Sequence, residues 1–160
     1  MDVFLTYTGH RLKKKKRQRI DVLVNVAGIL DSLASADAVT DREWNRVLAT
    51  NLTVPVRMMR AVLPWMRSRG DGAIVNVAST AATSGGVAGV AYTASKHGLL
   101  GATRNVAWRF RNEGIRCNAV LPGAVDSGIG KAIAAAAAAT GGGDGDGRGK
   151  YDEESWAQIE

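Results

Sequence analysis

Three short runs of apolar residues divide the chain, and a turn follows each of them. The runs cover residues 20–24, 73–77 and 115–121. A continuous apolar run, as opposed to an alternating one, is typical of a buried strand in a parallel sheet that helices cover on both faces. Small and turn-forming residues come directly after each run. The pattern therefore predicts three buried strands.

Two segments with helical spacing lie between the predicted strands. The first begins at residues 40–43, where the order Thr-Asp-Arg-Glu predicts a capping box, and its apolar face continues to Met66. The second runs over about 91–112 and is closed by Gly114. The order strand, helix, strand, helix, strand predicts right-handed parallel crossovers, and hence an α/β fold.

Asn51 interrupts the apolar face of the first predicted helix, and Pro55 follows four residues later. Because proline has no N–H, the Asn51 carbonyl loses its usual helical partner, and we expect the helix to kink. Two interpretations of Asn51 stay open. It can be a buried asparagine that bonds a neighbouring loop, which is the commoner case for such a residue alone. It can also direct a polar side chain and a free carbonyl towards a site in the core.

The composition fits one modest globular domain, with 160 residues of which 46% are apolar and 22% charged. The single cysteine, Cys117, cannot form an internal disulfide, and the start of the chain lacks the pattern of a signal peptide, so we expect a reducing, cytoplasmic setting. The apolar runs are too short to span a bilayer. His10 and His97 are isolated in the sequence, and we expect no metal site.

The net charge of +6 originates in one basic block, residues 11–19. Such a block can be a nuclear-localisation or polyanion-binding segment. No aromatic residue interrupts it and no nucleic-acid recognition motif accompanies it, so we favour a solvated arm over residues 1–19 and treat nucleic-acid binding as the lesser alternative. Residues 129–160 are an Ala-rich helical segment followed by a Gly/Asp-rich tail that we expect to be flexible. The predicted domain is therefore 20–128.

Tyr92 and Lys96 lie four residues apart on the second predicted helix, so their side chains should be neighbours on one face. A nearby ammonium favours the phenolate form, and we expect Lys96 to lower the pKa of Tyr92 so that it exchanges a proton near neutral pH. Ser79 stands at the carboxyl end of the second predicted strand, where open parallel sheets place their ligands. These three residues suit the interconversion of a carbonyl and an alcohol, because the oxygen gains or loses a proton during that reaction.

Five motifs in this order and spacing resemble the short-chain dehydrogenase/reductase family. The resemblance covers about residues 20–128, and its motifs are Asn25-Val26-Ala27-Gly28, Asn51, Asn76-Val77-Ala78-Ser79, Tyr92-Thr93-Ala94-Ser95-Lys96, and Pro122-Gly123 with Ser127. It implies an α/β fold with a Rossmann-like, doubly wound parallel sheet. It also implies an enzyme that interconverts a small alcohol and a ketone with NAD or NADP, which the sequence does not distinguish.

The resemblance implies a role for each matching residue. Tyr92 would be the general acid and base, Lys96 would hold the nicotinamide ribose, Ser79 would bond the substrate oxygen, and Asn51 would anchor a water that relays protons. The residues that would line the cofactor are Tyr92 and Lys96 together with Asn25, Ala27, Gly28, Pro122, Gly123 and Val125.

The chain also departs from the family pattern. The family opens with a strand and a glycine-rich loop that binds the cofactor pyrophosphate, and Thr8-Gly9 is its only echo here. The second strand of the family, whose end selects NAD or NADP, and its last strand have no counterpart either. We therefore expect an incomplete sheet in a truncated chain. The alternative to an active enzyme is an inactive fragment or pseudoenzyme that pairs with a full-length homologue. A folded chain is expected to form a homo-oligomer through the helices that hold Asn51 and Tyr92.

Overall fold

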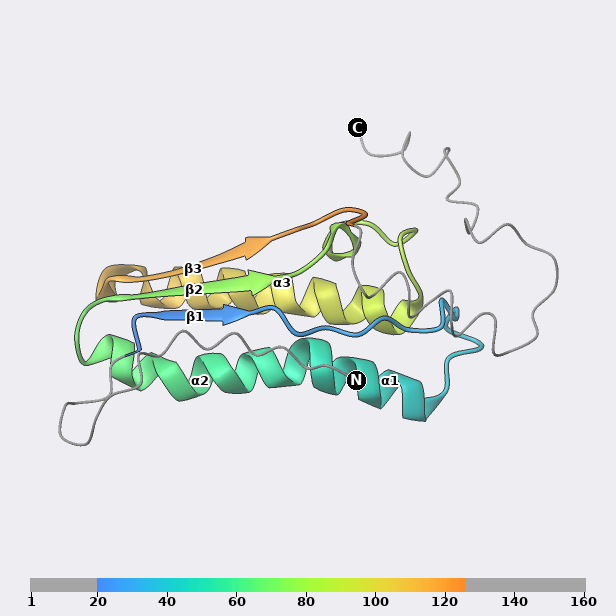
Figure 1. The fold of residues 1–160 in the computed structure, drawn as a ribbon, viewed down its shortest axis with the longest axis horizontal. Helices are drawn as coiled ribbons and strands as arrows, with labels where there is room; N and C mark the ends of the chain where they lie inside the picture. The colour runs from blue at the N-terminus through green and yellow to red at the C-terminus, as the bar shows by residue number, and fades with distance from the viewer. Residues whose placement is uncertain (1–19, 126–160) are drawn as a thin grey trace.

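The computed structural model describes residues 20–125, which form a three-stranded sheet and the helices that connect its strands. The basic block at 11–19 and the Ala-rich and Gly/Asp-rich segments of 129–160 lie outside the described residues, so the predictions made for them remain predictions. Figure 1 shows the strands in one layer, with the long helices running beside them.

The sheet is parallel, with the strands in the order β1-β2-β3. The strands are β1 (Val22–Asn25), β2 (Gly72–Val77) and β3 (Ile115–Val120). Asn25 is in register with Asn76, and Val77 is in register with Val120, so the carboxyl ends of the strands lie at one edge of the sheet. The three predicted strands and their parallel arrangement are confirmed.

The first crossover starts with helix α1 (Asp41–Leu48). As the capping box predicts, the Thr40 hydroxyl accepts a hydrogen bond from the Glu43 N–H, at 3.2 Å. The reciprocal half of the box is wrong, because the Glu43 carboxylate accepts hydrogen bonds from the N–H and the hydroxyl of Ser32 instead, at 2.5 and 2.9 Å. The start of α1 is thereby tied to the loop that follows β1.

A π-helical turn, η1 (Ala49–Thr53), separates α1 from helix α2 (Val54–Arg67). The Val54 N–H donates to the Ala49 carbonyl, five residues back, and Pro55 stands in the first turn of α2. Because Pro55 has no N–H, it cannot donate the usual helical hydrogen bond to the Asn51 carbonyl. Where a kink is expected near Pro55, the structure has a π-helical turn, and such turns often accompany a functional site.

The second crossover contains a short 3₁₀ turn, η2 (Thr80–Ala82), and the long helix α3 (Val90–Phe110). The turn η3 (Arg111–Glu113) follows, and Gly114 ends it with a φ of 72° before β3 begins. A φ in this left-handed range favours glycine, which explains why Gly114 closes the helix as predicted.

One face of the sheet carries the core, which α2 and α3 cover. Its buried members are Leu23, Met59, Val62, Met66, Ile74, Ile115 and Cys117. On the other face Val22 and Val120 are 41% and 52% exposed, so in the described part of the chain helices cover one face, and not both as expected. Two right-handed crossovers that proceed in the same direction across a sheet place their helices on the same side. None of the helices in the described part of the chain is both long enough and apolar enough to cross a bilayer.

Candidate active site

The predicted catalytic residues converge where β2 ends and α3 begins. Ser79 follows β2, Tyr92 and Lys96 lie in the first two turns of α3, and Asn51 lies in the π-helical turn. All four are buried, with Asn51 completely enclosed. Burial of four polar side chains costs free energy unless each finds a partner. The partners therefore indicate what each residue does.

The ammonium group of Lys96 points to the carboxyl end of β2. Its Nζ donates a hydrogen bond to the Val77 carbonyl at 3.0 Å and lies 5.4 Å from the centre of the Tyr92 ring. Burial lowers the pKa of Lys96 to about 8, because a desolvated ammonium is disfavoured. Lys96 and Tyr92 are neighbours, as their spacing in the sequence predicts.

The phenol of Tyr92 is held in its protonated form by its surroundings. Burial is the largest influence and raises the pKa of Tyr92, the negative charge of Asp31 raises it further, and a hydrogen bond with Ser79 lowers it. The expected net lowering of the Tyr92 pKa is therefore wrong, because desolvation of the phenolate outweighs the other influences. The Ser79 hydroxyl also accepts a hydrogen bond from the Ala81 N–H, at 3.2 Å.

The Asn51 side chain bonds the loop after β1. Its Oδ1 accepts from the Ile29 N–H and its Nδ2 donates to the Ile29 carbonyl, both at 2.9 Å. Nδ2 also donates to the Ser95 hydroxyl at 3.1 Å. The interpretation of Asn51 as a structural asparagine is thus confirmed for its side chain. The Asn51 carbonyl is a separate group, and Pro55 cannot donate to it.

Gly28 brings the loop after β1 against the catalytic side chains. A methyl group in place of its hydrogen would lie 3.5 Å from Lys96 Nζ and 3.6 Å from Asn51 Oδ1. Gly28, Asn51 and Lys96 therefore meet at one point, with Ala27 half-buried in the preceding position. Because Gly28 has no side chain, the main chain of this loop passes close to the Lys96 ammonium.

The side chain of Asn25 is not directed to this site. It is buried, and its Nδ2 donates to Asn76 Oδ1 at 2.7 Å. Asn76 in turn donates to the Thr103 hydroxyl at 2.8 Å. These bonds form a polar network inside the core, so the side chain of Asn25 is engaged there and its main chain is the part available to a cofactor. The cofactor-binding role of Asn25 stays a prediction.

Of the predicted cofactor-binding residues after β3, two lie near the catalytic residues and one does not. The Pro122 carbonyl accepts a hydrogen bond from the Thr80 N–H at 3.0 Å, which brings the Pro122-Gly123 pair next to Ser79. Val125 is 64% exposed, and within residues 20–125 no hydrogen bond ties it to the site. The structure therefore brings Pro122 and Gly123 to the catalytic residues and leaves Val125 at the surface.

Asp31 is a buried carboxylate at this site that the sequence did not reveal. It is 7% exposed, and it accepts hydrogen bonds from the N–H groups of Gly89 at 3.1 Å and Tyr92 at 2.7 Å. Its neighbours in the sequence are typical of a polar loop. The partners on α3 are about 60 positions away, as the separations of 58 and 61 residues show, and no local pattern indicates contacts at that range.

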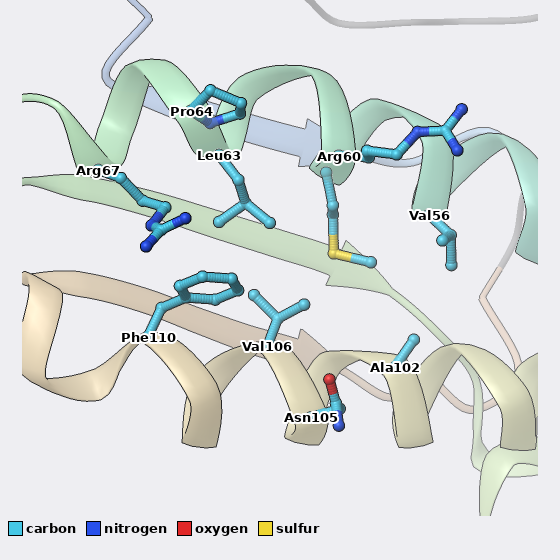
Figure 2. A pocket seen from close by; sticks show the side chains of 10 residues that line it. Val56, Arg60, Leu63, Pro64, Arg67, Ala102, Asn105, Val106 and Phe110 are labelled. Carbon is cyan, nitrogen blue, oxygen red and sulfur yellow. The ribbon is translucent and has the colours of Figure 1, made fainter.

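A separate groove of about 400 Å³ lies between α2 and the C-terminal half of α3. Figure 2 shows Leu63 and Val106 directed into it from the two helices, with Arg67 and Phe110 at one end. The Arg67 guanidinium lies 5.4 Å from the Phe110 ring centre and pairs with Glu113. None of the predicted catalytic residues lines this groove. Within residues 20–125 no three His, Cys, Asp or Glu side chains gather to hold a metal ion.

Curated relatives of the chain include several fungal proteins. The chain is 66% identical over 115 residues to the short-chain dehydrogenase/reductase cdmF of Talaromyces verruculosus, a match that covers 72% of this chain and 45% of that protein. It is 63% identical over 108 residues to the asnovolin H dehydrogenase nvfC of Aspergillus novofumigatus, with 68% of this chain and 42% of that protein covered. The chain thus spans about half the length of these relatives.

Solved structures and a family model agree with the relatives. The structure of ElxO with NADP bound matches with a TM-score of 0.67 and 34% identity, over 74% of this chain and 48% of that one. The family model for short chain dehydrogenase matches residues 10–138. The buried Tyr92, Lys96 and Ser79 lie in that range, at the carboxyl end of β2 in a parallel sheet of the Rossmann type. The chain therefore belongs to the short-chain dehydrogenase/reductase family.

Proposed function

We propose that the protein is an NAD(P)-dependent oxidoreductase that interconverts an alcohol and a ketone. The observation that carries the proposal is the position of Tyr92 beside a hydroxyl group and an ammonium group. The Ser79 side chain is near enough to the phenol to lower its pKa, and the Lys96 ammonium lies 5.4 Å from its ring centre. Such a group can give a proton to a carbonyl oxygen or take one from an alcohol.

Tyr92 acts as the general acid in the direction of reduction. Because its pKa is raised above the ordinary value of 10.0, the phenol carries its proton at neutral pH. Ser79 bonds the same substrate oxygen and stabilises the negative charge that develops on it. In the direction of oxidation Tyr92 has to lose its proton first, so that direction needs a higher pH.

Lys96 holds the sugar next to the reacting ring of the cofactor. An ammonium has three N–H donors, and within the described residues the bond to the Val77 carbonyl uses one of them. The others would donate to ribose hydroxyls next to Gly28, which lies beside the Lys96 ammonium. A charge-assisted donor buried in this way binds a hydroxyl more strongly than a donor in water does.

Asn51 contributes through its main chain. Its side chain is committed to Ile29 and Ser95, whereas its carbonyl cannot receive the usual helical bond from Pro55. A carbonyl of this kind is a natural acceptor for a water molecule. A water there would carry protons between solvent and Lys96.

The described residues fit the nicotinamide and ribose end of an NAD(P) molecule. Supporting observations are the enclosed Lys96 donor, the approach of Gly28 to that donor and the Pro122-Gly123 pair beside Ser79. The cofactor, when bound, supplies or accepts the hydride at the substrate carbon. The solved structure of ElxO contains NADP, which supports a nicotinamide cofactor for this chain.

Cofactor binding and turnover are tested with the full chain. NADH and NADPH are titrated separately and followed by their fluorescence, and ketones and secondary alcohols are then supplied, with asnovolin H included because one relative is named for it. We expect binding of one cofactor and a turnover that Tyr92→Phe reduces by about 10²- to 10⁴-fold. Gly85→Ala is the matched control, because a methyl group there meets open space. A folded chain that neither binds nor turns over would refute the active-enzyme proposal.

A second proposal follows from the groove between α2 and α3. Its apolar lining and the exposed Trp65 and Trp108, which are 60% and 62% accessible, favour association of these helices with those of another copy or of a full-length homologue. An inactive chain would then serve as a partner subunit. Light scattering on the pure protein, alone and mixed with a homologue, tests this proposal, and a folded monomer in both samples would contradict it.

A further inference from the structure

Helix α3 obtains its N-terminal cap from a distant loop. Its N-cap residue is Gly89, which has no side chain to accept from the first-turn amides. Asp31 performs this task from the loop after β1. Its Oδ2 accepts from the Tyr92 N–H at 2.7 Å, in the third position of the helix, and its Oδ1 accepts from the Gly89 N–H at 3.1 Å. A local aspartate at the N-cap would bond the same third-position amide.

The loop that carries Asp31 is itself fixed on three sides. Asp31 Oδ1 also accepts from the Leu33 N–H at 3.2 Å, and the Val90 N–H donates to the Ala34 carbonyl at 2.9 Å. Leu33 has a φ of 65°, a strained value for a bulky residue that persists only where the surroundings enforce it. Ser32 bonds Glu43 at the start of α1. The carboxylate is thus held rigidly against α3.

Gly89 is the residue that permits this contact. A methyl group at Gly89 would lie 2.6 Å from Asp31 Oδ2 and 2.8 Å from the Ala34 nitrogen. Both distances are too short for van der Waals contact, so the loop and the helix can meet only while position 89 lacks a side chain. The close approach is specific to this position, because a methyl group at the nearby Gly85 meets nothing within 4 Å.

We propose that Asp31 is a positioning residue for Tyr92. Its carboxylate holds the main-chain N–H of Tyr92 and thereby sets the position of Tyr92 in the active site. The proposal rests on the proposed function of Tyr92 as the acid and base. An error of about 1 Å in the position of such a group costs roughly 100-fold in rate. A clamp on the Tyr92 amide itself therefore acts on the rate of proton transfer more than on binding.

Because Asp31 is charged, the proposed role predicts an effect on the ionisation of Tyr92 that helix capping alone would not produce. Among the described residues, the Lys96 ammonium lies 5.4 Å from the Tyr92 ring centre, and the Ser79 side chain and the Asp31 charge both influence the pKa of the phenol. Among these the Asp31 charge raises the pKa of Tyr92. Asp31→Asn keeps the shape of the side chain, removes the charge and turns one acceptor into a donor that faces an N–H group. This variant should lower the pH at which the phenol ionises.

The test compares Asp31→Asn with Asp41→Asn in the full chain. Asp41 is a suitable control because it is an exposed carboxylate in the first turn of another helix, α1. Three properties are measured: the hydrogen exchange of the Gly89 and Tyr92 amides, the ionisation of Tyr92 obtained as the difference from Tyr92→Phe, and kcat and KM. For Asp31→Asn we expect faster exchange at both amides, earlier ionisation of the phenol, and a kcat that falls about 10- to 100-fold while KM for the cofactor changes less than about threefold.

The outcomes separate this proposal from the proposed function. Unchanged Tyr92 exchange and ionisation in a folded Asp31→Asn protein would overturn the role of Asp31. A wild-type chain without activity would remove the proposed function, while the exchange and ionisation of Tyr92 still decide whether Asp31 positions it. Should Asp31→Asn fail to fold, Gly89→Ala is compared with Gly85→Ala. Faster Tyr92 exchange in Gly89→Ala alone supports the proposal, and equal exchange in the two variants overturns it.

Discussion

The side-chain amide of Asn51 forms two hydrogen bonds with the main chain of Ile29. Oδ1 accepts from the Ile29 N–H and Nδ2 donates to the Ile29 carbonyl, each at 2.9 Å. A side-chain amide can satisfy a donor and an acceptor of the same residue, whereas a carboxylate or an apolar group cannot. This pairing fixes the loop that carries Gly28 and Asp31 over the active site.

Loss of the Asn51 amide should destabilise the fold. Asn51→Ala leaves the N–H and the carbonyl of Ile29 without their partner, at a cost of about 1–3 kcal/mol. Asn51→Asp should be more harmful at pH 7 than at pH 4, because a charged carboxylate repels the Ile29 carbonyl and a protonated one can still donate. Urea unfolding measures the free energies. Asn45→Ala, at an exposed position of α1, is the control, and equal stabilities of the two alanine variants would contradict the prediction.

The two reaction directions should respond to pH in opposite ways. Tyr92 keeps its proton at neutral pH because burial raises its pKa, so the reduction of a ketone should proceed there and slow down as the pH rises through that pKa. Oxidation of the alcohol should become faster over the same range. Tyr92→Phe should reduce kcat by about 10²- to 10⁴-fold in both directions.

Initial rates in both directions over a series of buffers test this prediction. The chemical step is isolated by single-turnover measurements, so that cofactor release does not mask the pH dependence. A pH profile of Tyr92→Phe that retains the wild-type activity and shape would show that another group carries the proton.

Burial of Lys96 should make the stability of the fold depend on pH. Its pKa falls from 10.5 to about 8 on folding, so between these values the unfolded chain binds more protons at this residue, and stability rises with pH across that window. The contribution is up to about 3 kcal/mol, since each pKa unit corresponds to about 1.36 kcal/mol.

Lys96→Met removes this dependence, so the free energy of unfolding of the wild type should rise relative to that of the variant between pH 8 and pH 10.5. Urea unfolding at matched ionic strength measures the difference. The surface substitution Arg57→Met serves as the control, because Arg57 lies on the exposed side of α2. A difference that stays constant with pH would mean that Lys96 is charged to the same extent in the folded and unfolded chains.

Two glycines with similar backbone angles should differ in their tolerance of alanine. Gly70 has a φ of 69° and Gly114 a φ of 72°. A methyl group at Gly70 meets open space, whereas one at Gly114 would lie 1.9 Å from the Gly70 carbonyl oxygen. We expect Gly70→Ala to cost about 1–2 kcal/mol, from backbone strain alone, and Gly114→Ala at least about 3 kcal/mol. Thermal unfolding of the two variants measures both costs, and equal losses would rule out the steric part of the prediction.

Sequence periodicity identified the strands and the long helices because both signals are local. Continuous apolar runs indicate buried strands, and helical spacing with Thr40 at the start and Gly114 at the end indicates helices, within a few residues in each case. The proximity of Tyr92 and Lys96 was predictable for the same reason, because four residues make about one helical turn. That Pro55 cannot donate to the Asn51 carbonyl was predictable too, because proline has no N–H.

The direction of the Tyr92 pKa shift was not predictable from spacing. Neighbouring charges are visible in a sequence, but desolvation depends on how completely the rest of the fold covers a side chain, and here desolvation is the larger influence. The same limit applies to Asn25, whose amide could face either a ligand or the core. In the sheet Asn25 is in register with Asn76, and the hydrogen bond between their side chains keeps the Asn25 amide in the core.

By itself, the sequence determined the α/β order of elements, the family and the presence of Ser79, Tyr92 and Lys96, since these depend on local patterns and on motif order. Only the tertiary structure decided that Asn51 holds Ile29 and that Asp31 caps the helix of Tyr92. The physical reason is that hydrogen bonds between distant segments depend on where crossovers and loops place the main chain. Asp31 and Tyr92 are 61 positions apart in the sequence, and only folding brings Asp31 Oδ2 to 2.7 Å from the Tyr92 nitrogen.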